Sequence, residues 1–119
     1  MIMEYNPSVE ILFNAIEVDQ QLPKDYEVAI FRLVQECLNN SLKHAKPTEI
    51  HVKVEFTAKH INVVVRDNGI GFDINEVKPN SLGLIGLRER VELLKGTMKI
   101  QSQVGQGTFV MFQIPYPGK

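Results

Sequence analysis

An alternating strand that ends in an acid and two glycines constrains this sequence most strongly. Ile61, Val63 and Val65 share one face of the strand, because side chains two residues apart point the same way. The same period places Asp67 on that apolar face, at the head of the stretch Asp-Asn-Gly-Ile-Gly-Phe at 67–72. An inward carboxylate is costly unless hydrogen-bond donors reach it, so this position predicts a recognition site.

The two glycines of this stretch sharpen that prediction. Gly69 and Gly71 carry no side chain at the point where a flat ring could approach the backbone. We therefore predict that this segment lies against the flat face of a base, and that an amino group of the base donates a hydrogen bond to Asp67. Asp-Asn-Gly also favours tight turns, so the acid taken by itself fits a turn equally well.

Size and charge bound the class of protein. The chain has 119 residues, enough for one domain with a single core. Its 13 basic and 14 acidic residues leave no strong field, and clustered Lys/Arg is missing, so neither nucleic acid nor a membrane surface is favoured as partner. We expect the isolated domain to be a monomer. The lone cysteine, Cys37, is predicted to be a core residue in a reducing compartment.

Hydrophobic periodicity predicts the element order β-α-β-β-α-β-β. The expected strands are 9–18, 48–56, 61–66, 97–103 and 108–114, and the expected helices are 22–45 and 84–95. Lys46-Pro47 should end the first helix and Gly96 the second, while residues 73–82 have no obvious structure. This order indicates an α+β fold: a two-layer α/β sandwich with a mixed, mostly antiparallel sheet covered on one face by helices.

A polar stripe runs along the first predicted helix. Glu36, Asn40, Lys43 and His44 fall within an arc of roughly a quarter-turn at about 100° per residue. The opposite side carries Phe31, Val34, Leu38, Leu42 and Ala45. An ordinary amphipathic surface helix gives the same pattern. The alternative is a metal-nucleotide site, since Mg²⁺ keeps most of its waters and one amide oxygen plus phosphates can hold it.

A second glycine pair opens the second predicted helix. Gly83 and Gly86 would expose backbone N–H groups at the positive end of the helix dipole, where phosphate binds well. Glycine before a helix is also common in simple turns. No Gly-Lys-Ser/Thr follows, and the spacing does not fit a dinucleotide fingerprint, so neither a P-loop nor a Rossmann site is predicted.

Four motifs in order carry a family resemblance over about residues 9–116. They are Glu36-x-x-x-Asn40-x-x-Lys43-His44, the Asp67–Phe72 stretch, Gly83-Leu-Ile-Gly86-Leu-Arg-Glu-Arg90 and Gly105-Gln-Gly107-Thr108. Together they resemble the ATP-binding catalytic domain of sensor histidine kinases, in the superfamily that includes gyrase, Hsp90 and MutL ATPase domains (the GHKL or Bergerat fold). The short connection between the glycine motifs is similar to a short-lid subfamily. The resemblance implies ATP and Mg²⁺ as ligands.

The resemblance also implies a role for each matching residue. Asn40 would ligate Mg²⁺, with Lys43 and His44 near the phosphates, and Asp67 would accept a hydrogen bond from the adenine amino group. Glu36 would be the catalytic acid or would orient the waters of the metal. The remaining nucleotide-binding positions implied are Gly69 and Gly71 beside the adenine, Gly83, Leu84, Gly86 and Leu87 at the return of the lid, and Thr108 beside Asp67.

As the resemblance implies, this domain gives the γ-phosphoryl group of ATP to a histidine on a separate dimerisation and phosphoacceptor domain of the parent chain, and so serves a response regulator indirectly. Residues 1–119 are then a single catalytic domain of a longer, membrane-anchored sensor. It would lie in the cytoplasm without touching the membrane, and would be unable to autophosphorylate by itself. Two alternatives stay open: a serine kinase of the anti-sigma-factor type, and a non-catalytic interaction module.

Overall fold

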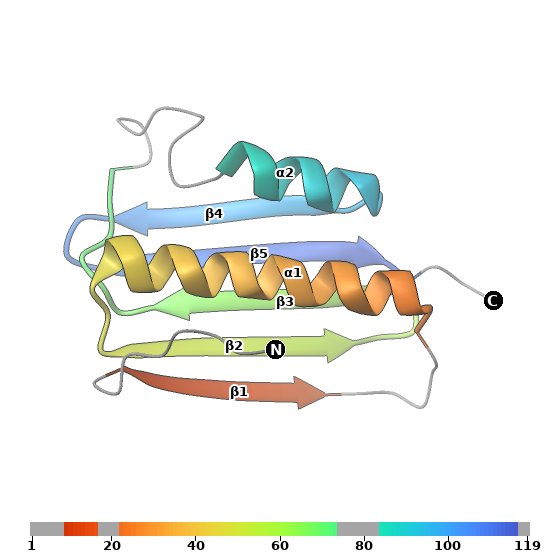
Figure 1. Ribbon diagram of the computed structural model, residues 1–119, viewed down its shortest axis with the longest axis horizontal. Coiled ribbons are helices and arrows are strands. Elements are labelled where there is room, and N and C mark those ends of the chain that lie inside the picture. Colours follow the sequence, from red (N-terminus) through yellow and green to blue (C-terminus); the bar gives the residue numbers. More distant parts are fainter. Residues whose placement is uncertain (1–8, 17–21, 74–83, 117–119) are drawn as a thin grey trace.

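The computed structural model describes residues 9–16, 22–73 and 84–116. Within these residues, helices cover one face of a single sheet, as the sequence predicts (Figure 1). The elements are β1 (Glu10–Ile16), α1 (Lys24–Asn40), the π-helix η1 (Ser41–Ala45), β2 (Glu49–Phe56), β3 (His60–Asp67), α2 (Leu84–Leu93), β4 (Thr97–Gln103) and β5 (Gly107–Pro115). None of the helices in the described ranges is long and apolar enough to cross a bilayer. The predicted connection at 73–82 falls, except for Asp73, outside the described residues.

The sheet has the strand order β1-β2-β3-β5-β4. β1 pairs with β2 in parallel, and the other three pairs are antiparallel, which confirms a mixed, mostly antiparallel sheet. Because of these directions, the C-terminal ends of α1, β3 and β4 and the start of β5 meet at one edge, on the left of Figure 1. Residues far apart in sequence are thereby gathered at that edge.

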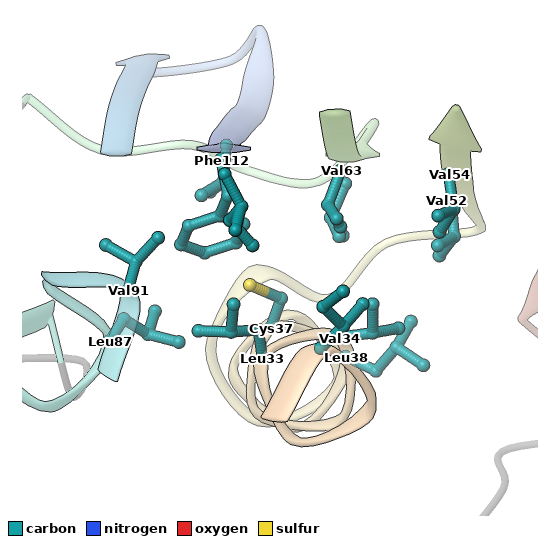
Figure 2. Packing of buried hydrophobic residues seen from close by; sticks show 14 of the residues in the cluster. Leu33, Val34, Cys37, Leu38, Val52, Val54, Val63, Leu87, Val91 and Phe112 are labelled. Carbon is teal, nitrogen blue, oxygen red and sulfur yellow. The ribbon is translucent and has the colours of Figure 1, made fainter. Parts of the chain in front are cut away.

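The core lies between the sheet and the two helices. Ile50, Val52 and Val54 of β2 are at most 6% exposed, so the predicted alternation of this strand is confirmed. Figure 2 shows side chains from β2, β3, β5, α1 and α2 meeting in one layer, with Phe112 above Leu87 and Val91. Each large aliphatic side chain buried in this way stabilises the fold by about 1.5–3 kcal/mol.

One part of the predicted apolar side of α1 is wrong. Phe31 is 48% exposed, whereas the buried face consists of Ile30, Leu33, Val34, Cys37 and Leu38. Phe31 lies about 100° around the axis from Ile30, so it falls just outside the stripe that contacts the sheet. Cys37 is a core residue as predicted, and burial, with a smaller effect of the Glu36 charge, raises its pKa to about 12.

The end of the first helix differs from a plain α-helix. Residues Ser41–Ala45 form a π-helix, which widens the last turn before the chain leaves the helix. Lys46 then takes a left-handed conformation, with φ 49°, and Pro47 follows, so the helix stops where the sequence predicts. This wide turn lies at the edge of the molecule where β3 ends (Figure 1).

Candidate functional site

Asp67 occupies the last position of β3 and points into the protein. It is 6% exposed, which confirms the inward direction predicted from the strand period. Its Oδ2 accepts a hydrogen bond of 2.8 Å from the Ser41 hydroxyl, and its Oδ1 accepts one of 2.9 Å from the Gly69 N–H. An ionised carboxylate has about four acceptor positions, so these two donors leave capacity for a donor brought by a ligand.

Gly69 lets the loop after β3 press against the end of the first helix. A Cβ at this position would lie 2.2 Å from the Ala45 carbonyl oxygen and 2.7 Å from the Ala45 Cβ. The next residue, Ile70, donates its N–H to the same Ala45 oxygen over 2.8 Å. The observed reason for glycine here is therefore the approach of two chain segments, and its approach to adenine stays a prediction.

Gly71 carries the same loop past the β4–β5 turn. Its φ of +65° favours glycine, and a Cβ there would lie 2.0 Å from the Gln103 carbonyl oxygen. Just before it, the Ile70 carbonyl oxygen accepts the Gly105 N–H over 2.6 Å. The loop is thus held between the helix end and the turn, which brings three of the four sequence motifs together.

Asn68 anchors the loop to the sheet, a role that the sequence analysis missed. Its Oδ1 accepts the backbone N–H groups of Thr48, at 3.0 Å, and Glu49, at 2.9 Å. Its Nδ2 donates to the Thr48 hydroxyl over 2.8 Å. These bonds fix the strand end on which Asp67 sits. An asparagine directly after a strand is a general sign of such local bonding.

The polar stripe of the first helix ends beside Asp67. Asn40 and Glu36 are half-buried on α1, while Lys43 and His44 are exposed on η1. The neighbour of Asn40, Ser41, bonds to Asp67, so the structure brings the stripe and the carboxylate into one site. Sequence reasoning did not select Ser41. The available signal was a small polar side chain on the buried face of the helix.

Thr108 lies opposite Asp67 in the sheet, as its partner in the β3–β5 register. The Thr108 hydroxyl lies 2.9 Å from the Ser102 hydroxyl. Ser102 Oγ also accepts the Phe72 N–H over 2.9 Å and donates to the Gly107 carbonyl oxygen over 3.1 Å. Thr108 therefore belongs to a hydroxyl network that holds the far end of the loop, and its contact with a base or water stays a prediction.

The second glycine motif is described only from Leu84 onward, and Gly83 lies outside the described residues. Leu84 begins α2 and is half-buried. Leu87 is 1% exposed and packs in the core, so core packing alone explains a leucine at this position. Gly86 is exposed, and a Cβ there would meet nothing within 4 Å. Packing does not require this glycine, so its predicted place near phosphate stays a prediction.

A separate hollow of about 560 Å³ lies across β3, β5 and β4. Arg66, Phe109 and Gln101 line it and are cross-strand partners, so their side chains share the sheet face opposite to Asp67. Thr108 also lines it, as the one member of the predicted site to do so among the residues that the structure describes. The Asp67 carboxylate lies on the other face, the one that the helices cover.

Comparisons with known proteins show the family to which the chain is similar. Residues 25–118 match the family described as histidine kinase-, DNA gyrase B-, and HSP90-like ATPase. The chain is 49% identical over 117 residues to the signal transduction histidine-protein kinase/phosphatase DegS of Bacillus subtilis (strain 168), covering 94% of this chain and 30% of that protein. It is 42% identical over 112 residues to DegS of Brevibacillus brevis, covering 94% of this chain and 29% of that protein. The chain thus spans under a third of these relatives.

Solved structures show the same fold. The histidine kinase domain of the Erythrobacter litoralis EL346 blue-light activated histidine kinase superposes with a TM-score of 0.74 at 27% identity, covering 93% of this chain and 53% of that one. The catalytic domain of the histidine kinase ThkA gives a TM-score of 0.72 at 17% identity, covering 92% and 79%. At 17% identity, the likeness to ThkA concerns the fold alone.

Proposed function

The chain belongs to the histidine kinase-, DNA gyrase B-, and HSP90-like ATPase family, as an ATP-binding catalytic domain of the histidine kinase type, and we propose how it holds its substrate. Adenine docks against Asp67, and the phosphates reach toward the end of the first helix. The observation that carries this proposal is the buried Asp67 carboxylate, held by Ser41 and Gly69 beside the helix that bears Asn40.

Recognition of adenine follows from the hydrogen bonds of the carboxylate. Asp67 accepts one bond at each oxygen and keeps acceptor positions for an amino group. Guanine presents a carbonyl oxygen where adenine presents that amino group, and two acceptors facing each other repel. A site built around a hydrogen bond rejects analogues that lack the matching group, so ATP should bind much more tightly than GTP.

The phosphates and the metal are assigned to the stripe on α1 and η1. Asn40 offers an amide oxygen of the kind that Mg²⁺ accepts, and Lys43 and His44 are exposed donors within one turn of it. Bound there, Mg²⁺ would offset the negative charge of the phosphate oxygens. Glu36, half-buried one turn before Asn40, is proposed to orient waters of the metal.

In this proposal the domain acts by positioning and charge stabilisation, because phosphoryl transfer asks for little covalent chemistry from the protein. The acceptor is a histidine on a dimerisation domain of the parent chain, and a response regulator receives the phosphoryl group afterwards. Residues 1–119 form one catalytic domain of a longer, membrane-anchored sensor, placed on its cytoplasmic side. The length of the curated relatives supports a longer parent chain, since they extend well beyond the part matched here.

Two measurements test the proposal. Calorimetry should detect ATP binding that tightens with Mg²⁺. A phosphoacceptor histidine domain added in trans with γ-labelled ATP should then acquire an acid-labile, base-stable phosphate. Asn40→Ala serves as the matched inactive control in the same assay. Acid-stable phosphate on a serine substrate would indicate the anti-sigma-factor type of kinase, and absence of nucleotide binding would indicate a non-catalytic module.

A further inference from the structure

We propose that Ser41 is a positioning residue that makes the base site selective for adenine by holding the Asp67 carboxylate through its hydroxyl. This inference rests on the proposed function, because it assumes that Asp67 meets the base. The end of the first helix would then have a second function, besides binding the phosphates. The same turn that carries Asn40 would also set the orientation of the acid that reads the purine.

The two side chains form a buried polar pair beside the apolar core. Among the described residues, Ser41 at 8% exposure and Asp67 at 6% are the buried polar or charged side chains. Their hydrogen bond of 2.8 Å joins positions 26 residues apart, from the start of η1 to the end of β3. A buried hydroxyl so placed has a specific partner rather than solvent.

The Ser41 hydroxyl donates its hydrogen bond to Asp67 and not to a carbonyl oxygen of its own helix. A helical serine commonly returns its hydroxyl to the carbonyl oxygen one turn earlier. Here the backbone N–H of Ser41 points to the carbonyl oxygens of Cys37 and Leu38, while its hydroxyl donates across the interface to Asp67. The π-turn begins at this residue, so the widened turn coincides with the contact.

Two donors on different oxygens fix the plane of the carboxylate. Ser41 holds Oδ2 and the Gly69 N–H holds Oδ1, so rotation about the side-chain bond would break at least one of them. The remaining lone pairs then point in set directions, which is what recognition of a single amino group requires. Removing the hydroxyl would leave one oxygen without its donor and the plane free to turn.

The same bond disfavours guanine. A hydroxyl has one proton, so Ser41 could donate to a guanine carbonyl only by abandoning Asp67. The buried carboxylate would then lose a donor while facing a second acceptor, and both losses oppose binding. Adenine needs no such rearrangement, because its amino group adds a donor to those already present.

A purely structural role for Ser41 predicts a different result. If the hydroxyl only satisfied a buried acid, its loss would weaken the fold and would affect all nucleotides alike. If the hydroxyl positions Asp67, removing it should weaken the binding only of nucleotides that carry the amino group. Purine riboside 5′-triphosphate, which lacks that group and keeps the sugar and phosphates, separates the two cases.

The experiment compares dissociation constants of ATP and purine riboside 5′-triphosphate, each with Mg²⁺, by calorimetry. The unchanged chain should prefer ATP. In Ser41→Ala the affinity for ATP should fall roughly 5- to 20-fold, as expected for one hydrogen bond to a charged group, and that for the analogue less than about twofold. Ser41→Thr, which restores a hydroxyl, should keep the preference. Cys37→Ala, a buried change one turn earlier, should leave the ratio of the two affinities unchanged.

The outcomes separate this inference from its premise. Absence of ATP binding by the unchanged chain, or equal affinity for both triphosphates, overturns the proposed adenine contact and this inference with it. A normal preference in the unchanged chain that persists in Ser41→Ala overturns the inference alone, as does an equal loss of both nucleotides. Should Ser41→Ala not fold, a folded Ser41→Thr that has lost the preference would also overturn it.

Discussion

Replacing Gly69 with alanine should separate the loop after β3 from the end of the first helix. The new Cβ would lie 2.2 Å from the Ala45 carbonyl oxygen, whereas ordinary contact begins near 3.4 Å, so the two segments must part by about 1.2 Å. The atoms in the way are backbone and Cβ atoms, which cannot swing aside as a long side chain does. The substitution therefore acts on the backbone itself.

This parting costs two hydrogen bonds at the site. The bond from the Ile70 N–H to the Ala45 oxygen, 2.8 Å long, would stretch to roughly 4 Å, beyond the useful range. The bond from the Gly69 N–H to Asp67 would also be misaligned. At about 1–2 kcal/mol for each bond, the free energy of unfolding should fall by roughly 2–4 kcal/mol.

Urea denaturation measures the free energy of unfolding, and calorimetry on the same samples measures ATP affinity. Gly86→Ala is the matched control for stability alone, because a Cβ there meets nothing within 4 Å and alanine favours a helix interior, which should raise stability by about 0.5–1 kcal/mol. Gly69→Ala should also bind ATP at least about tenfold more weakly, since Asp67 loses a donor. Equal stability of the two variants, together with an ATP affinity of Gly69→Ala equal to that of the unchanged chain, would refute this reasoning.

Three further predictions concern the base, the metal and the core. Asp67→Asn should weaken ATP binding by roughly tenfold or more, because an amide lacks the charge and one acceptor; calorimetry showing unchanged affinity would remove the contact. Asn40→Ala should weaken ATP binding in the presence of Mg²⁺ more than in EDTA, and equal effects would exclude Asn40 as a ligand. The raised Cys37 pKa, about 12 against 9.0, means that the folded state keeps its proton while the unfolded thiol ionises. Stability should therefore fall between pH 9 and 12, by about 1.4 kcal/mol at pH 10, and urea denaturation of Cys37→Ala should lack that loss.

Much of the fold could be predicted from local sequence patterns. The strand period predicted both the layer that Ile61, Val63 and Val65 enter and the inward direction of Asp67, because alternation depends only on neighbouring residues. Lys46-Pro47 predicted the end of the first helix for the same local reason. The order of the elements then indicated the two layers.

Features that depend on contacts between distant segments were not predictable in this way. Phe31 was misplaced because the packing of α1 against β3 and α2 decides which of its edges is covered. The π-turn at Ser41 and the bond from Ser41 to Asp67 require the strand end to lie against the helix end. Gly69 was selected for a ligand, yet the Ala45 carbonyl oxygen is what a side chain there would strike.

A crystal structure of the chain with Mg²⁺ and a non-hydrolysable ATP analogue would show directly whether Asp67 contacts the adenine. We expect the adenine amino nitrogen to lie within about 3.2 Å of an Asp67 carboxylate oxygen, with Ser41 still bonded to that carboxylate. Adenine bound instead in the hollow beside Arg66 and Phe109, on the opposite face of the sheet, would contradict it.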